Sequence, residues 1–395
     1  MISRMSPVAR RLCWFYSALF LITGVQLPYW PLWLEAQGLG KAQVGDVIAV
    51  GIWIRTLASP AAAWLADRAD SRRRLVLGLA GLALLISLLY AVVAGYTALL
   101  LVTAAFMTVS IPQGPLTESL TLLAARQGQA DYGKTRLFGS ASFLVMALVA
   151  GVVLQGQPAS RVLWLLWAAL GATFVAAFWL PDLRAQRAEG PARSWSVEVR
   201  SARGLWTALL GIACVHASHA AYYAFSTIHW RAIGIGEAAA GGLWAIGVLG
   251  EIVLFRFGSP LTRVLGVRGL LLLGAAGAMV RWVLFAVCDS PFVVVPNQLL
   301  HAFSFGATHL AAVGWIQQHV PERVLSTAQS LYSATSFGAG MGLAMLVAGR
   351  LYAVQPGYAF WAMSGLCLAG GLIGLIAMPG LPRGIVLRPS GGESH

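Results

Sequence analysis

The chain has 395 residues, of which 58% are hydrophobic and 10% charged, with a net charge of +13. A soluble protein of this length could not bury so much apolar surface, because part of its exterior has to be polar. The basic residues alternate between connecting loops instead of forming one face or tail, which argues against a nucleic-acid-binding protein.

A membrane-spanning helix needs about 20 mainly apolar residues, and the sequence predicts twelve such spans. The first apolar run, from Leu12, is too long for a cleavable signal and lacks a small-residue cleavage site, so we expect it to be the first span. The predicted spans are 12–35, 42–66, 75–94, 97–124, 135–155, 161–180, 205–231, 238–258, 269–288, 291–319, 324–352 and 357–379.

Two polar side chains lie deep in the first two predicted spans. Gln26 lies deeper than the neighbouring aromatic residues, which are typical of a membrane-interface belt. Arg55 lies inside an apolar stretch, where a charge costs about 3 kcal/mol and normally faces a partner or a water-filled cavity. We predict that both residues bind substrate.

The loop after the second span reads AWLADRADSRRR. Asp67 and Arg68 lie at the end of one helix and Arg72 begins the next, so a breakable ion pair here could hold a cytoplasmic gate closed. The alternative is that the arginines serve only as a positively charged topology signal.

The fourth span contains Glu118 within IPQGPLTES, where Pro112 and Pro115 should disturb the helix. Arg136 begins the fifth span. A guanidinium offers fixed donors that match a carboxylate at two points, so Arg136 is a predicted anchor for an anionic substrate, with Glu118 in the same site. Alternatively, Arg136 only marks the end of its helix.

The seventh span reads HASHAAYYAF, and helical spacing places His219, Tyr222 and Tyr223 near one face with His216. This face could bind an aromatic or polar organic molecule. Alternatively, the histidines bond neighbouring carbonyls in a helix interface. No helix shows a convincing pattern of metal ligands, so we expect no metal and no cofactor.

Four ionisable residues follow in the eighth to tenth spans, namely Glu251, Arg281, His301 and His309. A carboxylate near a cation and a histidine can take up and release a proton as its surroundings alternate. We predict a proton-coupling role for these residues, with a static ion pair between helices as the alternative.

The polar connection 181–203 divides the spans six and six, and the two halves repeat each other. At an offset of 196 residues, 38–40 (GLG) falls on 234–236 (GIG) and Arg55 falls on Glu251; at an offset of 194, LFGSASF (137–143) falls on LYSATSF (331–337). Repeats of this kind predict two six-helix bundles with a substrate site between them near the midplane. The predicted domains are 1–180, the linker 181–203, 204–380 and a tail 381–395.

Basic residues are distributed unequally between the two predicted sides, about 21 against 4. With an even number of spans, this asymmetry places both termini in the cytoplasm. The fold class is therefore an all-α integral membrane protein with twelve transmembrane helices in two pseudo-symmetric six-helix bundles. The four basic residues on the opposite side are Lys41, Arg161, Arg231 and Arg350.

This layout and the A-x-x-x-D-R-x-D-x-R-R loop resemble the major facilitator superfamily. More specifically, DYGKTRLFGS (131–140), HAAYYAFSTIHW (219–230), VRW (280–282) and LLHAFSFGATHLAA (299–312) resemble the phenylpropionate-transporter group, over about residues 14 to 378. That resemblance implies a multi-pass protein of the bacterial inner (plasma) membrane that transports an aromatic carboxylic acid in symport with protons.

The same segments are similar, more distantly, to lactose permease and other oligosaccharide–proton symporters. The resemblance implies that Glu118 and Arg136 form the core of the substrate site, and that Glu251, Arg281 and His301 couple the proton. Ser304 stands where that family has its proton-bearing glutamate. The proton then falls to Glu251 or to the histidines, and a disaccharide becomes a less suitable substrate.

We therefore predict a proton-coupled importer of a small organic acid, with an aromatic carboxylate such as 3-phenylpropionate favoured. Its partners would be the substrate, a proton and the lipid bilayer, and it would act as a monomer. The alternatives are a proton symporter for a sugar or nucleoside, and an exporter of amphipathic compounds by proton exchange. An enzyme is not expected, because no cluster of His and Asp lies at a membrane face.

Overall fold

The computed structural model describes residues 5–68, 71–183, 204–320 and 325–378, and only the backbone of 57–68, 325–326 and 377. Within these ranges every regular element is a helix, so the predicted all-α class is confirmed. The predicted tail 381–395, and the predicted linker beyond residue 183, lie outside the described residues.

The described part of the first half contains seven α-helices, and side-chain caps mark where some of them begin. Ser6 accepts the N–H of Ala9 at 3.0 Å before the first helix, which satisfies a donor that has no partner inside the helix. The predicted fourth span is broken at residues 111–112, as Pro112 and Pro115 suggested. The helices are α1 (Pro7–Ala36), α2 (Lys41–Arg68), α3 (Arg72–Leu88, continued by η2, Leu89–Ala91), α4 (Tyr96–Ser110), α5 (Gln113–Arg126), α6 (Tyr132–Leu154) and α7 (Arg161–Ala177).

In the second half, three of the predicted spans are divided. The seventh breaks at residues 218–219, and the tenth and eleventh each contain a π-helical tract, η3 (Ala302–Ala307) and η5 (Ala334–Gly340). The remaining helices are α9 (Leu205–Ala217), α10 (Ala220–Ala232), α11 (Glu237–Arg256), α12 (Gly258–Val287, with a kink at Gly266), α13 (Pro291–Leu299), α14 (Thr308–His319), α15 (Leu325–Ser333), α16 (Met341–Val354) and α17 (Pro356–Ala377).

Ten helical segments of the described chain are long and apolar enough to cross a membrane. The two other predicted spans correspond to α2, which is 28 residues long, and to α7, a shorter apolar helix of 17 residues. The chain is a multi-pass membrane protein, while the count of twelve spans stays a prediction.

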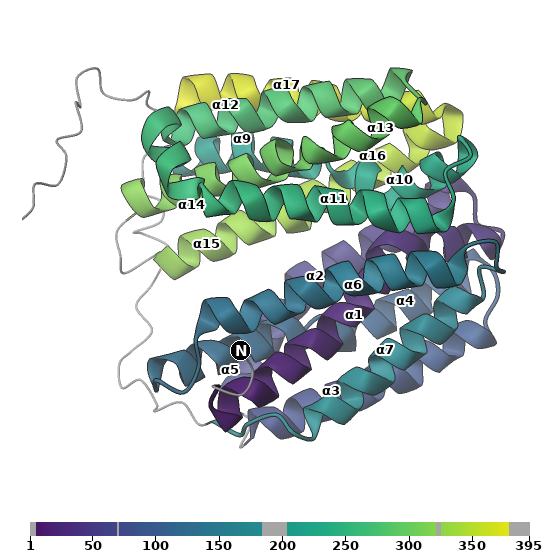
Figure 1. Cartoon of the computed structure of the whole chain (residues 1–395), viewed down its shortest axis with the longest axis vertical. Helices are drawn as coiled ribbons and strands as arrows, with labels where there is room; N and C mark the ends of the chain where they lie inside the picture. Colours follow the sequence, from purple (N-terminus) through teal and green to yellow (C-terminus); the bar gives the residue numbers. More distant parts are fainter. Residues whose placement is uncertain (1–4, 69–70, 184–203, 321–324, 379–395) are drawn as a thin grey trace, which may run out of the picture.

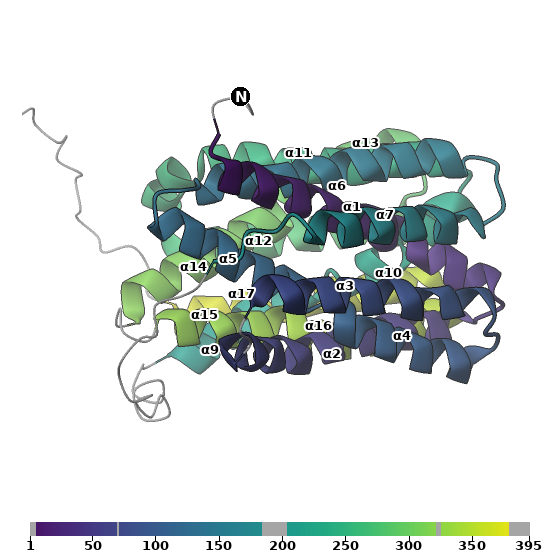
Figure 2. The same ribbon diagram turned by 90° about the horizontal axis from the view of Figure 1, so that it is seen from below.

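The helices run side by side along one direction, in two groups (Figures 1 and 2). Helices α1 to α7 form one group and α9 to α17 the other (Figure 1). The two groups meet at one end of the molecule and diverge towards the other end, where α5 and α15 lie (Figure 1).

The predicted repeat appears in the backbone itself. Gly38 and Gly234, related by the offset of 196, both have positive φ, 84° and 86°. Each turn has the same hydrogen bonds, because Leu39 N–H bonds the carbonyl of Leu34 and Ile235 N–H bonds that of Trp230. Only glycine adopts this conformation at little cost, so the two halves make the same turn from matched residues.

Two close contacts at glycines bring the halves together at the end where they meet, which we call the closed end. A Cβ on Gly45 of α2 would lie 3.0 Å from Cα of Gly349 on α16, and a Cβ on Gly241 of α11 would lie 2.5 Å from the carbonyl oxygen of Ala147 on α6. Gly45 and Gly241 are related by the offset of 196. The absence of side chains there allows the helices to touch.

Polar contacts complete the closed end. The Tyr29 hydroxyl of α1 donates to the carbonyl of Ala147 within the first half at 2.8 Å and lies 3.3 Å from that of Glu237 in the second half. Arg350 of α16 forms an ion pair with Asp46 of α2 at 2.9 Å.

Candidate functional site

The break in the seventh span gives His219 a definite orientation. Its Nδ1 lies 3.2 Å from the carbonyl of Val215 and 3.1 Å from that of His216, both near the end of α9. Nδ1 therefore carries the hydrogen and donates to these carbonyls, and Nε2 is left as an acceptor. The side chain of His219 thus adds a hydrogen bond to two carbonyls at the helix break, which also accept from the Ser218 hydroxyl and from the backbone N–H of His219.

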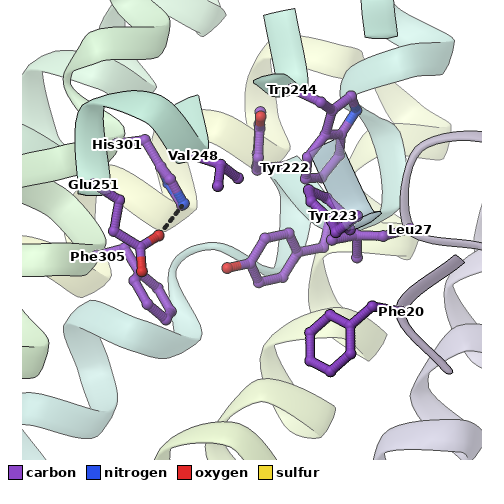
Figure 3. Close-up of a pocket in the computed structure, with 10 residues that line it drawn as sticks. Phe20, Leu27, Tyr222, Tyr223, Trp244, Val248, Glu251, His301 and Phe305 are labelled. Atoms are coloured by element: carbon purple, nitrogen blue, oxygen red, sulfur yellow. Dashed lines mark ion pairs between the residues drawn. The ribbon is translucent and has the colours of Figure 1, made fainter. Parts of the chain in front are cut away.

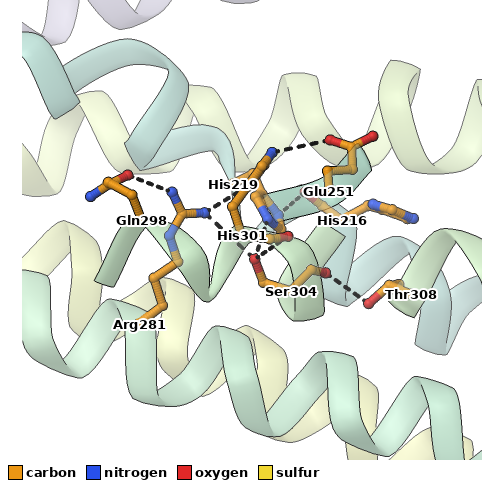
Figure 4. Close-up of polar contacts among 8 residues, drawn as sticks. All are labelled: His216, His219, Glu251, Arg281, Gln298, His301, Ser304 and Thr308. Carbon is orange, nitrogen blue, oxygen red and sulfur yellow. Dashed lines mark hydrogen bonds and ion pairs between the residues drawn. The ribbon is translucent and has the colours of Figure 1, made fainter. Parts of the chain in front are cut away.

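Arg281 of α12 lies at the centre of a buried polar network (Figure 4). Its side chain is 0% exposed. Nη2 donates to Oε1 of Gln298 at 3.1 Å, and Nη1 lies 3.0 Å from Nδ1 of His301. The guanidinium carbon lies 4.1 Å from the ring centroid of Tyr222, close enough for a cation–π contact. The network therefore fixes this cation in one place.

His301 lies between Arg281 and Glu251 of α11. A guanidinium has no acceptor, so Arg281 donates to Nδ1 and the hydrogen of the neutral ring lies on Nε2. Nε2 lies 3.6 Å from Oε2 of Glu251. If His301 took up a second ring proton, that proton would lie on Nδ1 and face the N–H of Arg281, so the hydrogen bond between them would be lost. Glu251 can be protonated without breaking this bond.

Ser304 connects Arg281 to His219. Its hydroxyl lies 3.1 Å from Nε2 of His219 and 3.5 Å from Nη1 of Arg281. Because Nε2 of His219 is an acceptor, Ser304 donates to it and receives the bond from Arg281. Two polar paths thus start at Arg281. One leads through His301 towards Glu251, which lies 3.6 Å from that ring, and the other is hydrogen-bonded through Ser304 and His219 to the carbonyls of α9.

A cavity of about 260 Å³ lies between the two halves, next to this network (Figure 3). The first half contributes residues of α1 and α6, and the second half contributes residues of α10, α11 and the start of η3. Most of the wall is aromatic, and Glu251 carries the one carboxylate among the lining residues. The wall consists of Phe20, Leu27, Phe143, Tyr222, Tyr223, Trp244, Val248, Glu251, His301 and Phe305.

On the side of the first half, Arg136 of α6 lies behind the wall. Its guanidinium carbon is 4.8 Å from the ring centroid of Phe20, which lines the cavity. Glu118 of α5 does not pair directly with Arg136 among the ion pairs of the described residues; it accepts a hydrogen bond from the Tyr132 hydroxyl at 2.5 Å. The Tyr132 hydroxyl thus holds this carboxylate, and among the described residues no carboxylate pairs directly with Arg136.

The family described as MFS_1 like matches residues 9–362. The chain belongs to this family. It is 32% identical over 356 residues to a protein of Escherichia coli K12 described as a probable 3-phenylpropionic acid transporter, covering 88% of this chain and 92% of that protein. It is 25% identical over 378 residues to a maltose permease of Geobacillus stearothermophilus, covering 92% and 93%.

Among solved structures, the nucleoside transporter NupG has the same fold, with a TM-score of 0.80 at 14% identity, covering 94% of this chain and 98% of that one. The protein is therefore a membrane transporter of the major facilitator kind, and not an enzyme. The predicted resemblance to that superfamily and to its phenylpropionate-transporter group is confirmed.

The cavity of the transporter contains four of the predicted site residues, namely Tyr222, Tyr223, Glu251 and His301. Arg281 and His219 contact this group directly from behind the wall. The structure places Glu251, Arg281 and His301 close together, as the sequence predicted. His301 lies between the other two. Their roles in proton coupling stay predictions.

Gln26 and Arg55 are not part of the described cavity wall. Gln26 is half-buried on α1, and its buried Nε2 has no hydrogen-bond partner. Arg55 of α2 is exposed. The sequence shows how deep these residues lie but not which way they face, and their part in binding stays a prediction.

Two of the three residues of the predicted gate, Asp67 and Arg68, have side chains that the structure does not describe. Arg72 is described, and its Nη1 donates to Ser119 of α5 at 2.8 Å, within the first half. A role for these three residues in gating is not tested.

His309 lies apart from the Arg281 network, bonded to Tyr332 of α15. Our sequence reasoning did not select Tyr332, Gln298, or the wall residues Phe20, Phe143 and Trp244. One signal for Tyr332 was present, because it stands in LYSATSF where the matching LFGSASF of the first half has Phe138. A hydroxyl added at a repeat position indicates a polar neighbour.

Proposed function

We propose that the transporter imports a small aromatic carboxylate, such as 3-phenylpropionate, together with a proton, across the bacterial inner membrane with both termini in the cytoplasm. The observation that carries this proposal is an aromatic cavity between the two halves, with one carboxylate, Glu251, in its wall. The name of the 32% identical Escherichia coli relative supports the substrate class.

The size of the cavity favours a single ring. Sites for drug-sized ligands measure about 300–1,000 Å³, and this cavity of about 260 Å³ is smaller. Phe20 and Phe143 from the first half and Tyr223 and Trp244 from the second could hold a flat apolar ring between them. A disaccharide would need more room and more polar partners.

Arg136 is the anchor that we propose for the substrate carboxylate. Its cation lies against Phe20 of the wall, and the Tyr132 bond to Glu118 leaves it available for a second carboxylate. Arg55 is the weaker candidate, because no described contact connects it with the cavity wall.

Glu251 is the group that we propose for the transported proton. When the cavity closes to water, an ionised Glu251 would face a neutral His301 as its partner, and a buried charge without an opposite charge costs several kcal/mol. A proton on Glu251 removes that cost, and a bound anion similarly compensates Arg136. Closure is therefore favoured when substrate and proton are both present, which is the requirement for symport.

The closed end supports a cycle of alternating access, in which the halves meet at one end and diverge at the other (Figure 1). In the proposed orientation the glycine contacts close the outer face. The cavity would then receive substrate from outside only after these contacts separate.

The test is uptake of labelled 3-phenylpropionate into right-side-out vesicles, with and without an inward proton gradient. One proton per substrate and a gradient of one pH unit should support up to about tenfold accumulation. Glu251→Gln should lose the stimulation by the gradient but keep exchange of internal for external substrate. Glu35→Gln, the same change at a residue near the end of α1 that pairs with Lys41 within the first half, serves as the control.

Uptake that ignores the gradient would contradict the proton coupling. If the acid is not taken up but a nucleoside or a disaccharide is, the carboxylate assignment is wrong.

A further inference from the structure

A second chain of polar side chains lies in the second half, apart from the cavity wall and the Arg281 network. It joins His216 of α9, Tyr332 of α15 and His309 of α14. The Tyr332 hydroxyl lies 2.9 Å from Nε2 of His216 and 2.9 Å from Nδ1 of His309. Three separate helices thus meet at one hydroxyl.

This chain is buried and has one open position. His216 is 0% exposed and Tyr332 is 5% exposed, while His309 is half-buried. Nδ1 of His216 is buried and has no hydrogen-bond partner in the part of the chain that the structure describes. An unsatisfied buried polar group costs about 1–3 kcal/mol, so its presence in a folded protein needs a reason.

The hydrogens of the chain can be arranged in two equivalent ways. In the first, His216 Nε2–H donates to the Tyr332 oxygen and Tyr332 O–H donates to His309 Nδ1. In the second, His309 Nδ1–H donates to Tyr332 and Tyr332 donates to His216 Nε2. The first leaves a free lone pair on His216 Nδ1, and the second leaves one on His309 Nε2.

These two arrangements allow the chain to hold and pass one extra proton. A proton that binds the free lone pair of His309 Nε2 makes an imidazolium. Nδ1–H of that ring can then pass to the Tyr332 oxygen while the Tyr332 hydrogen passes to His216 Nε2. Each step makes one N–H or O–H bond and breaks one, so no other reactant is needed.

The charged and titratable groups around the chain link it to Glu251. Tyr332 is near enough to Glu251 and Tyr223 to interact with them electrostatically, and His216 interacts in this way with His219 and His301. Arg281 lies beyond His219 and His301. An ionised Glu251 therefore stabilises a positive charge on the chain, and a protonated Glu251 does not.

The position along the helices places the chain toward one end of the molecule. Each of the three residues lies 7 to 11 residues from one helix end, which is the start of α9 for His216, the end of α14 for His309 and the start of α15 for Tyr332. At 1.5 Å per residue this is roughly 10–16 Å. The end in question is opposite the closed end, and the π-helical tracts η3 and η5 lie directly beside His309 and Tyr332.

We propose that His216, Tyr332 and His309 form a second proton-binding site, which shares one proton and exchanges it with the cytoplasmic side when Glu251 changes its charge. The assignment of the side and the link to transport rest on the proposed function. The inference that the three residues share one proton rests only on the hydrogen-bond geometry.

The test is ¹⁵N NMR of the histidine rings in the purified full-length protein, titrated with pH. In the wild type, the His216 and His309 signals should change over the same pH range, because one proton is shared between them. Tyr332→Phe removes the hydroxyl that joins the rings, and the two midpoints should then separate by about one pH unit or more. Tyr90→Phe, which removes the bond of another buried tyrosine to Thr103, serves as the matched control.

Two independent titrations in the wild type that Tyr332→Phe leaves unchanged would overturn the proposal. The variant Glu251→Gln distinguishes a failure of this proposal from a failure of the proposed function. In this variant the joint titration should persist, with the proton held less tightly because the neighbouring negative charge is gone. If Glu251→Gln transports with an unchanged proton dependence, the proposed function fails while the second site is still decided by Tyr332→Phe.

Discussion

The two halves of the transporter have matching backbone turns and glycine contacts but different polar side chains in the membrane. Gly38 and Gly234 make the same turn, and Gly45 and Gly241 make matched contacts at the closed end. In the second half a buried arginine orders a network of hydrogen bonds, whereas in the first half Arg136 is held mainly by aromatic contacts. The repeat thus gives the two halves matching turns and contacts, and in our proposal the residues that differ divide the tasks of binding and coupling.

The largest effect is expected from Arg281→Met. The change leaves His301 Nδ1 and Gln298 Oε1 without their donor, at about 1–3 kcal/mol for each. We expect transport to be lost and the thermal unfolding midpoint in detergent to fall clearly. Arg55→Met, the same change in the first half, should alter the midpoint little. An equal fall in both variants would contradict the contrast between the halves.

The next effect concerns the feature that the halves share. Gly45→Leu and Gly241→Leu should each prevent closure, because even a Cβ would lie 3.0 Å and 2.5 Å from the facing backbone. We expect uptake to fall at least about tenfold in each, since a loss of 1.4 kcal/mol in the closed state already gives that factor. Uptake in vesicles measures this effect. Gly242→Leu, at a position with no neighbour within 4 Å, should leave it unchanged.

A smaller effect should follow from Tyr132→Phe in the first half. Without this hydroxyl, Glu118 is free to pair with Arg136 and compete with the substrate carboxylate. A hydrogen bond to a charged group is worth about 1.5–3 kcal/mol, so we expect the KM for 3-phenylpropionate to rise about tenfold with little change in kcat. Tyr16→Phe is the control, because the buried Tyr16 hydroxyl has no hydrogen-bond partner. A fall in kcat with an unchanged KM would argue against this competition.

The smallest effect concerns Asp131, which caps α6 and lies just before the membrane-spanning segment. The backbone N–H of Lys134 donates to Asp131 and, with the Lys134 side chain, lowers the pKa of this carboxyl. A lowered pKa stabilises the helix start above the pKa of the unfolded chain, and the contribution is lost as the pH falls through the folded value. Amide hydrogen exchange at residues 132–136 should therefore be faster in Asp131→Ala at neutral pH. The difference from wild type should vanish in acid, and a difference that persists would mean that the carboxylate charge is not responsible.

The sequence was sufficient for the class of fold and for the repeat, because hydropathy and matched glycines report directly on spans and turns. It also indicated the break at Pro112, since proline lacks the helix donor. The breaks in the seventh, tenth and eleventh spans were missed, because residues 218–219 and the π-helical tracts contain no proline.

For the site, the charged residues in the membrane were the informative signal. Glu251, Arg281 and His301 were found because such charges are costly, and the structure places them together. Gln26 was also selected, but it lies outside the described wall, because depth does not give the rotation of a helix about its axis. Tyr332 was not selected, because a single aromatic residue in an apolar helix looks like packing.

The π-helical tracts η3 and η5 have a mechanical consequence. A π turn accommodates about one residue more than an α turn, and one residue corresponds to about 100° of rotation and 1.5 Å of length. If either tract converts to α geometry, the helix beyond it has to swivel by that angle. Such a conversion would give the polypeptide two points of rotation, one between His301 and His309 and one starting two residues after Tyr332, at which side chains could turn without movement of whole bundles.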